Sequence, residues 1–366
     1  TLYGRNASGG AINVISNDAR IGSNSGYFGF GVGNYGLLEG NGALNLSIGD
    51  NAAVRISGQI IDRDGYTSNG GQDQKLQAGR VRFVFEASNS LTLRLSADIS
   101  HVGGVGSGSV IKGWTGETPT GQDPWRDNTS APFAFPFRFG PATAPFTAPD
   151  DRFVDQTSWG IRGQIDWDLG FANLTFIPAF RSMDSQSTAY ASNFRFYEDN
   201  RADQTSVELR LGNSSSLFTW VAGLYYYSED QYISLSAFSS GALNGLNVSP
   251  QTSAWAAFGQ ATFSVTDELR VIGGLRYTNE TFDADYQRGT SGLPIVGFVP
   301  LAPLVDTQPL HFNHVDFKIG AEYDVSDQNM LFATYSTGFK GGGLSTTPNC
   351  GGDPFSAETV EAWTIG

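Results

Sequence analysis

The chain has 366 residues and a formal net charge of −14, a balance that argues against nucleic acid and anionic membrane surfaces as partners. Its 46 glycines, 26 phenylalanines and 14 tyrosines stand against 2 methionines, and this composition favours strands and tight turns over helices. The longest apolar stretch, 293–305, contains three prolines and is too short to cross a bilayer, which excludes a helical transmembrane span. The length suits either two or three soluble domains or one large β architecture, and the composition favours the second.

The chain opens with a glycine-rich turn, LYGRNASGGAINVIS at 2–16, which ends in a short predicted strand. A phosphate-binding P-loop needs a lysine and a serine or threonine after its last glycine, but Ala11 and Ile12 follow Gly10. A dinucleotide-binding turn needs a strand before the glycines and a helix after them, and the order here is reversed. We therefore do not expect this turn to bind a nucleotide.

Four later segments alternate apolar and polar residues with a period of two: 91–100, 159–167, 269–277 and 315–325. In the first of them, Leu93 and Leu95 face one side while Arg94 faces the other. These patterns persist for roughly 9–13 residues, which exceeds the about 5–6 residues of a typical globular strand and suits the about 9–11 residues of a tilted transmembrane strand. The alternation therefore predicts strands that cross a membrane.

Short and long connections take turns between the predicted strands. Short turns are predicted at 88–90, 170–172, 212–216, 266–268 and 326–329. Long loops are predicted at 64–74, 102–154, 185–203, 229–251, 283–313 and 341–357. Bacterial outer-membrane barrels have this asymmetry, with short periplasmic turns and long extracellular loops. We therefore expect about fourteen strands between residues 25 and 366, with odd-numbered strands running outward.

Five stretches resemble one known family. They are, in chain order, LYGRNASGGAINVIS, WVAGLYYYSED, AAFGQATFSVTDELRVIGGLRYTNET, DFKIGAEYDVSDQNMLFATYSTGFKGGG and ETVEAWTIG. The first is similar to the closing motif of the plug domain in TonB-dependent outer-membrane receptors, and the others are similar to successive barrel strands of that family. The resemblance implies an all-β fold, a transmembrane antiparallel β-barrel of roughly 22 strands filled by an N-terminal plug.

The same resemblance implies a domain division. Residues 1–24 would be the C-terminal remnant of the plug domain, and residues 25–366 would be a partial barrel with about 14 of the roughly 22 strands. The chain is therefore expected to be a fragment truncated at both ends. The box that contacts TonB would lie before residue 1.

The resemblance also implies a function: energised import of a scarce nutrient across the outer membrane of a Gram-negative bacterium. A ligand would bind outside, the plug would rearrange, and TonB would supply the energy. A ferric siderophore, an iron chelate, is the commonest ligand class in the family, while vitamin B12, haem and saccharides remain alternatives. A passive outer-membrane channel or porin is a further alternative, as is a secreted β-rich adhesin. The expected partners are TonB, outer-membrane lipid and a small-molecule ligand, with no nucleic acid.

The plug motif supplies the first candidate site residues. Its glycines would allow tight turns against the barrel wall, and Arg5 would make charged hydrogen bonds to carboxylates on the inner face of the barrel. The alternative for Arg5 is a solvated turn residue. The inner-face candidates are Glu208, Asp316, Glu322, Asp324 and Glu358. The motif residues are Leu2, Tyr3, Gly4, Arg5, Asn6, Gly9, Gly10 and Asn13.

A second group of candidates lies in the long connections. Seven tryptophan and phenylalanine residues stand between positions 114 and 146, more than solubility requires. They form either a platform for the ligand or a set of mutual contacts that orders a long loop. The segment 190–199 poses the same choice. The ligand-binding candidates are Trp114, Trp125, Arg126, Tyr190, Phe194 and Tyr197.

No other motif in the sequence indicates a metal-binding or catalytic site. His311 and His314 would point to opposite faces of a strand, which is poor geometry for a metal site. The stretch DRDGY at 62–66 lacks the third oxygen ligand and the terminal glutamate of a calcium loop and is typical of a turn. No nucleophile elbow occurs, and nothing marks a carboxylate pair as acid and base. The sequence predicts no enzyme, no bound metal and no cofactor.

Overall fold

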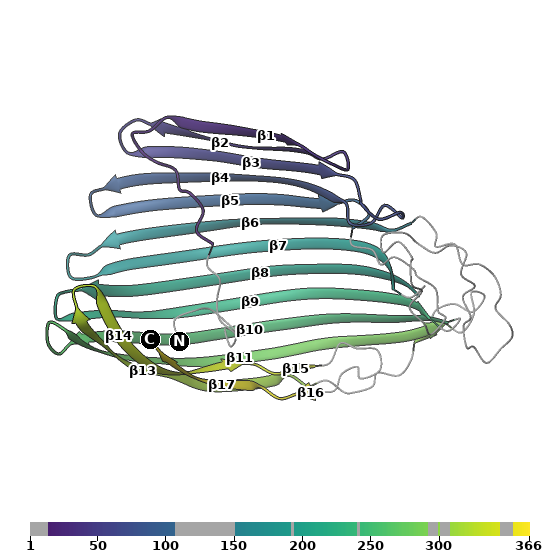
Figure 1. The fold of residues 1–366 in the computed structure, drawn as a ribbon. Coiled ribbons are helices and arrows are strands. Elements are labelled where there is room, and N and C mark those ends of the chain that lie inside the picture. Colours follow the sequence, from purple (N-terminus) through teal and green to yellow (C-terminus); the bar gives the residue numbers. More distant parts are fainter. Residues whose placement is uncertain are drawn as a thin grey trace.

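The computed structural model describes residues 14–106, 151–191, 194–239, 242–291, 299–300, 308–344 and 354–366. Every regular element in these residues is a β-strand, and none of them forms a helix long and apolar enough to cross a bilayer. Fourteen strands pair in one antiparallel sheet in chain order, β1 to β11 followed by β13, β14 and β17. Figure 1 shows this sheet curving into an open trough, so the strands form part of a barrel wall that is not closed.

The strands lengthen toward the middle of the sheet. The first seven are β1 (Ser25–Val32), β2 (Leu38–Ile48), β3 (Ala52–Arg63), β4 (Gln74–Ser88), β5 (Leu91–Gly103), β6 (Phe153–Asp168) and β7 (Asn173–Ala191). The next five are β8 (Phe194–Ser214), β9 (Phe218–Ser239), β10 (Ala242–Ser264), β11 (Leu269–Ser291) and the short β12 (Val299–Pro300) beside β11. The last five are β13 (Leu310–Ser326), β14 (Asn329–Lys340), β15 (Gly343–Leu344), β16 (Pro354–Phe355) and β17 (Glu358–Ile365).

The short turns predicted between the strands are confirmed. Two residues join β4 to β5 and two join β13 to β14, and the turns that were predicted to be short lie at one edge of the trough (Figure 1). Two of these turns need a backbone with positive φ, which Gly49 (φ +62°) and Gly170 (φ +84°) adopt without strain. The Asp168 side chain accepts a hydrogen bond from the Gly170 N–H at 2.8 Å and closes its turn.

Two of the predicted long loops are wrong, and a third, 283–313, is shorter than predicted, because β11 continues to Ser291 and β13 begins at Leu310. The segment 185–203 was expected as a loop, but β7 continues to Ala191 and β8 begins at Phe194, with Ala191 opposite Phe194. The segment 229–251 is likewise strand, because β9 continues to Ser239 and β10 begins at Ala242. These ends project beyond the about 9–11 residues that a tilted membrane strand requires, which is the strand length on which the prediction rests. Apolar residues still occur there, since Leu246 and Val248 of β10 are buried in a cluster against which Ile233 of β9 packs.

The outward face of the sheet is an apolar belt. Register places Leu95 opposite Phe83 on β4, and Ile99 opposite Trp159 on β6, and directly opposite residues share a face. Leu95 is 47% exposed, Ile99 is 56% exposed and Leu224 is 57% exposed. A continuous surface of this kind is unfavourable in water but matches the lipid-facing band of an outer-membrane barrel. The predicted alternation is confirmed, and the belt sets the position of the membrane.

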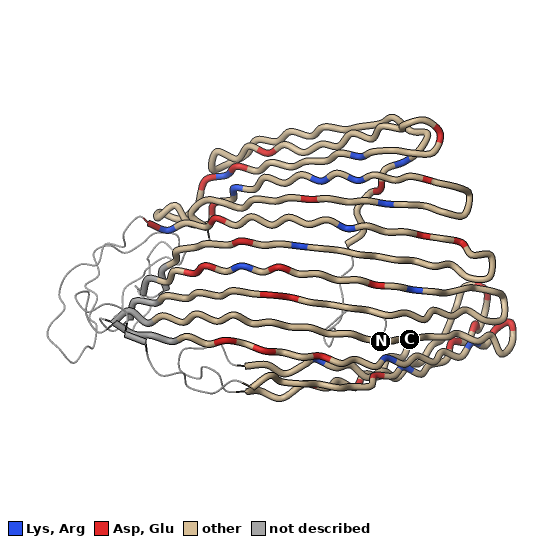
Figure 2. The backbone as a smooth tube through the Cα atoms, turned by 180° about the vertical axis from the view of Figure 1, so that it is seen from behind, with Lys and Arg blue, Asp and Glu red and all other residues tan. Residues whose placement is uncertain are grey.

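The opposite, concave face carries the polar residues. Figure 2 shows charged residues spread along the strands over much of the trough, with basic residues more frequent over β3–β7. By register, Arg82 of β4 lies opposite Arg55 and Ser96, and Ser96 lies opposite Arg162. This face would line the interior of a closed barrel, and any site for a solute passing through must be built on it.

Candidate functional site

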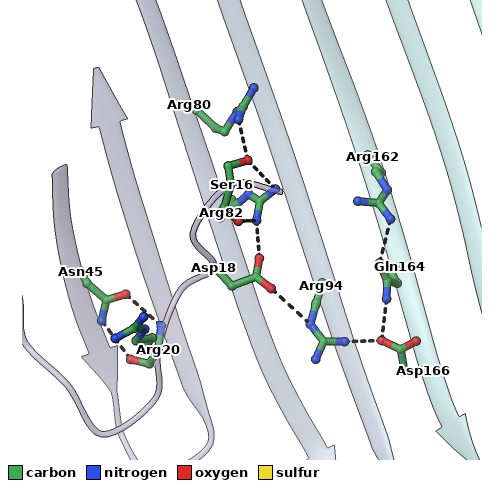
Figure 3. Close-up of polar contacts among 10 residues, drawn as sticks. All are labelled: Ser16, Asp18, Arg20, Asn45, Arg80, Arg82, Arg94, Arg162, Gln164 and Asp166. Carbon is green, nitrogen blue, oxygen red and sulfur yellow. Dashed lines mark hydrogen bonds and ion pairs between the residues drawn. The ribbon is translucent and has the colours of Figure 1, made fainter. Parts of the chain in front are cut away.

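A segment of irregular backbone, Val14–Asn24, crosses the concave face before the chain enters β1 (Figure 3). Asn45 of β2 fixes the end of this segment, because its side-chain N–H groups donate to the carbonyls of Arg20 at 2.9 Å and Ser23 at 2.6 Å. The Asn45 side-chain oxygen accepts from the Arg20 backbone N–H at 2.8 Å. Asn45 is 1% exposed, so one buried amide satisfies three backbone groups that no strand pairs.

Arginines of β4 hold the start of the segment. Arg82 donates to the Ser16 carbonyl at 2.9 Å, to the Ser16 hydroxyl at 3.0 Å and to the Asp18 carboxylate at 2.5 Å. Arg80 donates to the Ser16 hydroxyl at 2.8 Å. Charge-assisted bonds from a rigid guanidinium are the stronger hydrogen bonds in proteins, so this contact fixes both the position and the direction of the segment.

The polar contacts continue from Asp18 across the sheet (Figure 3). Arg94 of β5 lies 3.9 Å from the other Asp18 oxygen and forms an ion pair with Asp166 of β6. Asp166 also accepts hydrogen bonds from Gln164 at 2.8 Å and Thr175 at 2.9 Å. Gln164 in turn accepts from Arg162 at 2.9 Å.

The same segment makes apolar contacts. Ala19 packs against Ala53 of β3 and Val84 of β4 in a buried cluster, with Ile21 at its edge. Ala53 is completely buried. A small residue at each point lets the segment approach the sheet closely, and burial of these side chains adds hydrophobic stabilisation to the polar contacts.

A second polar group is buried on the concave face of β11 and β13. Arg276 lies opposite Asp316 in the register, and each is 6% exposed. Arg276 donates to the Thr278 hydroxyl at 3.1 Å, and its guanidinium lies 5.8 Å from the ring centres of Tyr225 and Phe258. These cation–π contacts partly replace the hydration that the buried guanidinium loses.

Near this second polar group, Gly341 lies close against the buried side chain of Glu280. Glu280 of β11 is 1% exposed, and a Cβ added at Gly341 would lie 2.3 Å from its carboxylate oxygen. The chain after β14 therefore passes directly over Glu280, and Leu344 joins a buried cluster with Leu246, Val248 and Ala284.

All five of the predicted inner-face carboxylates have a basic neighbour on the wall itself. Glu208 lies 3.1 Å from Arg210, Glu322 lies 3.0 Å from Arg270, and Glu358 lies 3.9 Å from Lys340. Asp316 lies 3.2 Å from the His314 ring nitrogen and accepts from Thr337 at 3.3 Å. Asp324 binds the same arginine as Glu322, at 2.7 Å. A role for these carboxylates in contacting the plug motif stays a prediction, because the motif residues 2–13 lie outside the described residues.

Sequence reasoning missed the contact that the structure does describe. It expected a plug arginine to meet barrel carboxylates, whereas here Arg80, Arg82 and Arg94 of the barrel wall meet the oxygens of Ser16 and Asp18. A signal was present in the sequence: all three arginines lie on the polar side of alternating strands. Nothing in the sequence indicated which backbone segment would lie against them.

The aromatic candidates divide into two sets. Trp114, Trp125 and Arg126 lie outside the described residues. Tyr190, Phe194 and Tyr197 were expected in a loop, but they belong to strands β7 and β8, where Tyr197 lies opposite Thr188. These residues lie in strands because the hairpin of β7 and β8 extends beyond the membrane. The role of Tyr190, Phe194 and Tyr197 as ligand contacts stays a prediction.

Titratable groups outside the membrane span show two shifts. Burial raises the pKa of Tyr286 on the outer extension of β11. A hydrogen bond to Asp62 at 2.8 Å raises the pKa of Lys75 at the outer end of β4. Within the described part of the chain, no cluster of three or more histidine, cysteine, aspartate or glutamate side chains could hold a metal ion.

Comparisons with known proteins agree with this geometry. The family described as TonB-dependent receptor-like β-barrel matches residues 115–366. The fold is similar to the ferric yersiniabactin uptake receptor FyuA from Yersinia pestis, with a TM-score of 0.81 and 16% identity over 100% of this chain and 55% of that one. It is also similar to the siderophore receptor PiuA from Acinetobacter baumannii, with a TM-score of 0.72 and 12% identity over 99% of this chain and 57% of that one.

A further similar structure is the ferric-catecholate import receptor Fiu from Escherichia coli K12, in its closed form, with a TM-score of 0.68 and 18% identity over 92% of this chain and 53% of that one. The chain therefore spans a little over half the length of these receptors. No protein with a curated description matches it.

An antiparallel sheet with an apolar outer belt and a polar inner face is the wall of an outer-membrane β-barrel. The chain belongs to the TonB-dependent receptor-like β-barrel family, whose model matches well over half of its length. It is a protein of the outer membrane of Gram-negative bacteria.

Proposed function

We propose that this protein imports a scarce nutrient, a ferric siderophore, across the outer membrane with energy supplied through TonB. The observation that carries the proposal is the segment Val14–Asn24, which the concave wall holds through Asn45, Arg80 and Arg82. A passive porin needs an unobstructed lumen, whereas a segment anchored across the wall fits a barrel that is closed at rest.

The mechanism follows from how the segment is held. Its anchors are hydrogen bonds to the buried Asn45, ion pairs of Asp18 with Arg82 and Arg94, and a small apolar cluster, and none of them is a covalent bond. Such contacts can break and reform in one transport cycle when work is supplied from outside the barrel. The proposal assigns binding and gating to the chain and no catalytic step.

The ligand class is supported by analogy. Three similar structures are described as receptors for ferric yersiniabactin, for siderophores and for ferric catecholates. These similarities lie below 20% identity, so they carry the fold and suggest the ligand class for a test.

The test uses the full-length receptor as the only receptor of its kind in iron-limited cells. Import of radioactive iron carried by siderophores of several classes is measured with and without a functional TonB protein. We expect import of at least one ferric siderophore, complete dependence on TonB and loss of import when the receptor gene is deleted. Import that continues without TonB would identify a passive channel, and import of only vitamin B12, haem or saccharides would identify another ligand class.

A further inference from the structure

Arginines dominate one part of the concave face. We use "arginine wall" for six of them that extend from β3 to β7 on this face: Arg55, Arg80, Arg82, Arg94, Arg162 and Arg181. The carboxylates that pair with them are Asp98 and Asp166 of the strands and Asp18 of the crossing segment. Six cations thus meet three anions, in a chain whose net charge is −14. The wall is a local positive surface in an acidic protein.

Two members of the arginine wall lack an anionic partner. Within the described residues, neither Arg55 nor Arg162 belongs to an ion pair, and the hydrogen bond of the Arg162 guanidinium goes to the neutral Gln164 at 2.9 Å. A guanidinium presents five N–H donors, so Arg162 keeps unused donors directed at the lumen. This excess charge is more than the crossing segment requires.

Two cavities lie between the crossing segment and the arginine wall. One, of about 430 Å³, is lined by Ser16, Asp18, Arg82, Arg94 and Arg162 among others. The other, of about 290 Å³, is lined by Ser16, Arg80, Arg162 and Arg181 among others. Ser16, Arg82 and Arg162 border both cavities, so arginine side chains line the open space on each side of the crossing segment.

The contacts of the segment show what these arginines recognise. Arg82 and Arg94 hold the two carboxylate oxygens of Asp18, and Arg80 and Arg82 hold the Ser16 oxygens. A carboxylate, phosphate or catecholate group presents oxygens of the same kind, and the planar guanidinium fork suits such groups. The segment therefore occupies positions that an anionic solute could take over without leaving the arginines unpaired.

We propose that the arginine wall binds the anionic groups of the transported iron chelate as the crossing segment leaves it, and that the imported cargo is an anion. This inference rests on the proposed function and names the charge class of its ligand. Exchange of the Asp18 and Ser16 oxygens for cargo oxygens keeps each guanidinium paired throughout, which lowers the energetic barrier to release of the segment. Arg162 contributes to cargo binding alone, since it holds no part of the segment.

The test uses the full-length receptor and three probes: an iron(III) tris-catecholate, iron(III) citrate and a neutral iron(III) trihydroxamate. We expect import of one or both anionic chelates and little of the neutral one. Arg162→Gln should slow anionic import by about tenfold, the loss of one charge-assisted hydrogen bond, while Arg162→Lys should keep most of it. Arg210→Gln is the matched control, because Arg210 of β8 lies outside the arginine wall beside Glu208 and borders neither cavity, and its import rate should match the parent.

Preference for the neutral chelate, or equal import by Arg162→Gln and the parent, would overturn the inference while leaving energised import intact. A second measurement is independent of iron: the reversal potential of the full-length receptor in a planar bilayer, with the segment loosened by urea. The parent should favour anions, and Arg162→Gln should shift the selectivity toward cations. If no chelate is imported, the proposed function fails, and unchanged selectivity in Arg162→Gln would still overturn the role of the wall.

Discussion

Two regions of the concave face solve the burial of charge in opposite ways. The arginine wall of β3–β7 is partly exposed, with the side chains of Arg82 18%, Arg94 36% and Arg181 47% exposed, and some of its partners belong to a segment that the sheet does not contain. The group on β11 and β13 is closed: Arg276 and Asp316 are each 6% exposed, and Glu280 is 1% exposed beneath Gly341. This difference in exposure means that the arginine wall can exchange its ionic partners, whereas the group on β11 and β13 is part of the folded core.

The physical reason lies in solvation. A buried charge has lost its water and must keep its protein partners, so a change of partner there is costly. A half-exposed arginine retains part of its hydration, so it can release one anion and bind another at modest cost. The region suited to a transport cycle is therefore the arginine wall, and the buried group holds the strands behind it in place.

The largest effect is expected in the buried region. Leu246→Ala should lower the free energy of unfolding of the full-length barrel by about 2–5 kcal/mol, because Leu246 is 2% exposed in a cluster with Val248 and Leu344. Urea unfolding in lipid vesicles measures this change. A loss below about 0.5 kcal/mol would show that the cluster collapses freely and that this region is not a rigid core.

The outward face provides the next comparison. Leu95→Arg should cost about 2–4 kcal/mol, because Leu95 faces lipid near the middle of the span. Its neighbour Arg94 faces the lumen, so Arg94→Leu should cost less in the same unfolding assay. Equal losses at both positions would contradict the assignment of the two faces.

Loosening of the crossing segment should give a smaller effect. Asn45→Ala removes three hydrogen bonds to the backbone of Arg20 and Ser23 and should cost about 1–3 kcal/mol locally. Hydrogen exchange of residues 16–24 in the full-length receptor should become faster while the strands keep their protection. As a control, Asn213→Ala removes two hydrogen bonds in an exposed turn, one donated to the Phe171 carbonyl and one accepted from the Ser214 N–H, and should leave this exchange unchanged.

The smallest effect is expected on the arginine wall. Arg181→Gln breaks an exposed ion pair with Asp98 at 3.0 Å, and such pairs contribute about 0.2–1 kcal/mol. Its unfolding midpoint in urea should therefore be close to that of the parent. A loss as large as that of Leu246→Ala would mean that the wall is structural and would remove the contrast between the two regions.

The sequence alone determined the architecture of the sheet. Strict alternation at 91–100 and 315–325, together with short and long connections in turn, was enough to predict transmembrane strands, their count and the position of the short turns. The prediction succeeded because the lipid-facing side chains of a transmembrane strand must be apolar and the lumen-facing side chains need not be. Apolar and polar residues therefore alternate with a period of two along each strand. The prediction failed at 185–203 and 229–251, because the strands there continue beyond the about 9–11 residues that a membrane span requires.

Only the tertiary structure decided which groups meet on the inner face. The contact between Asp18 and the arginines Arg82 and Arg94 joins residues more than sixty positions apart, and it depends on the path of a segment without periodicity. The burial of Glu280 under Gly341 likewise depends on where the chain returns after β14. Local patterns specify which face a side chain occupies, whereas the curvature of the sheet and the course of the segment across it decide which oxygen each arginine binds.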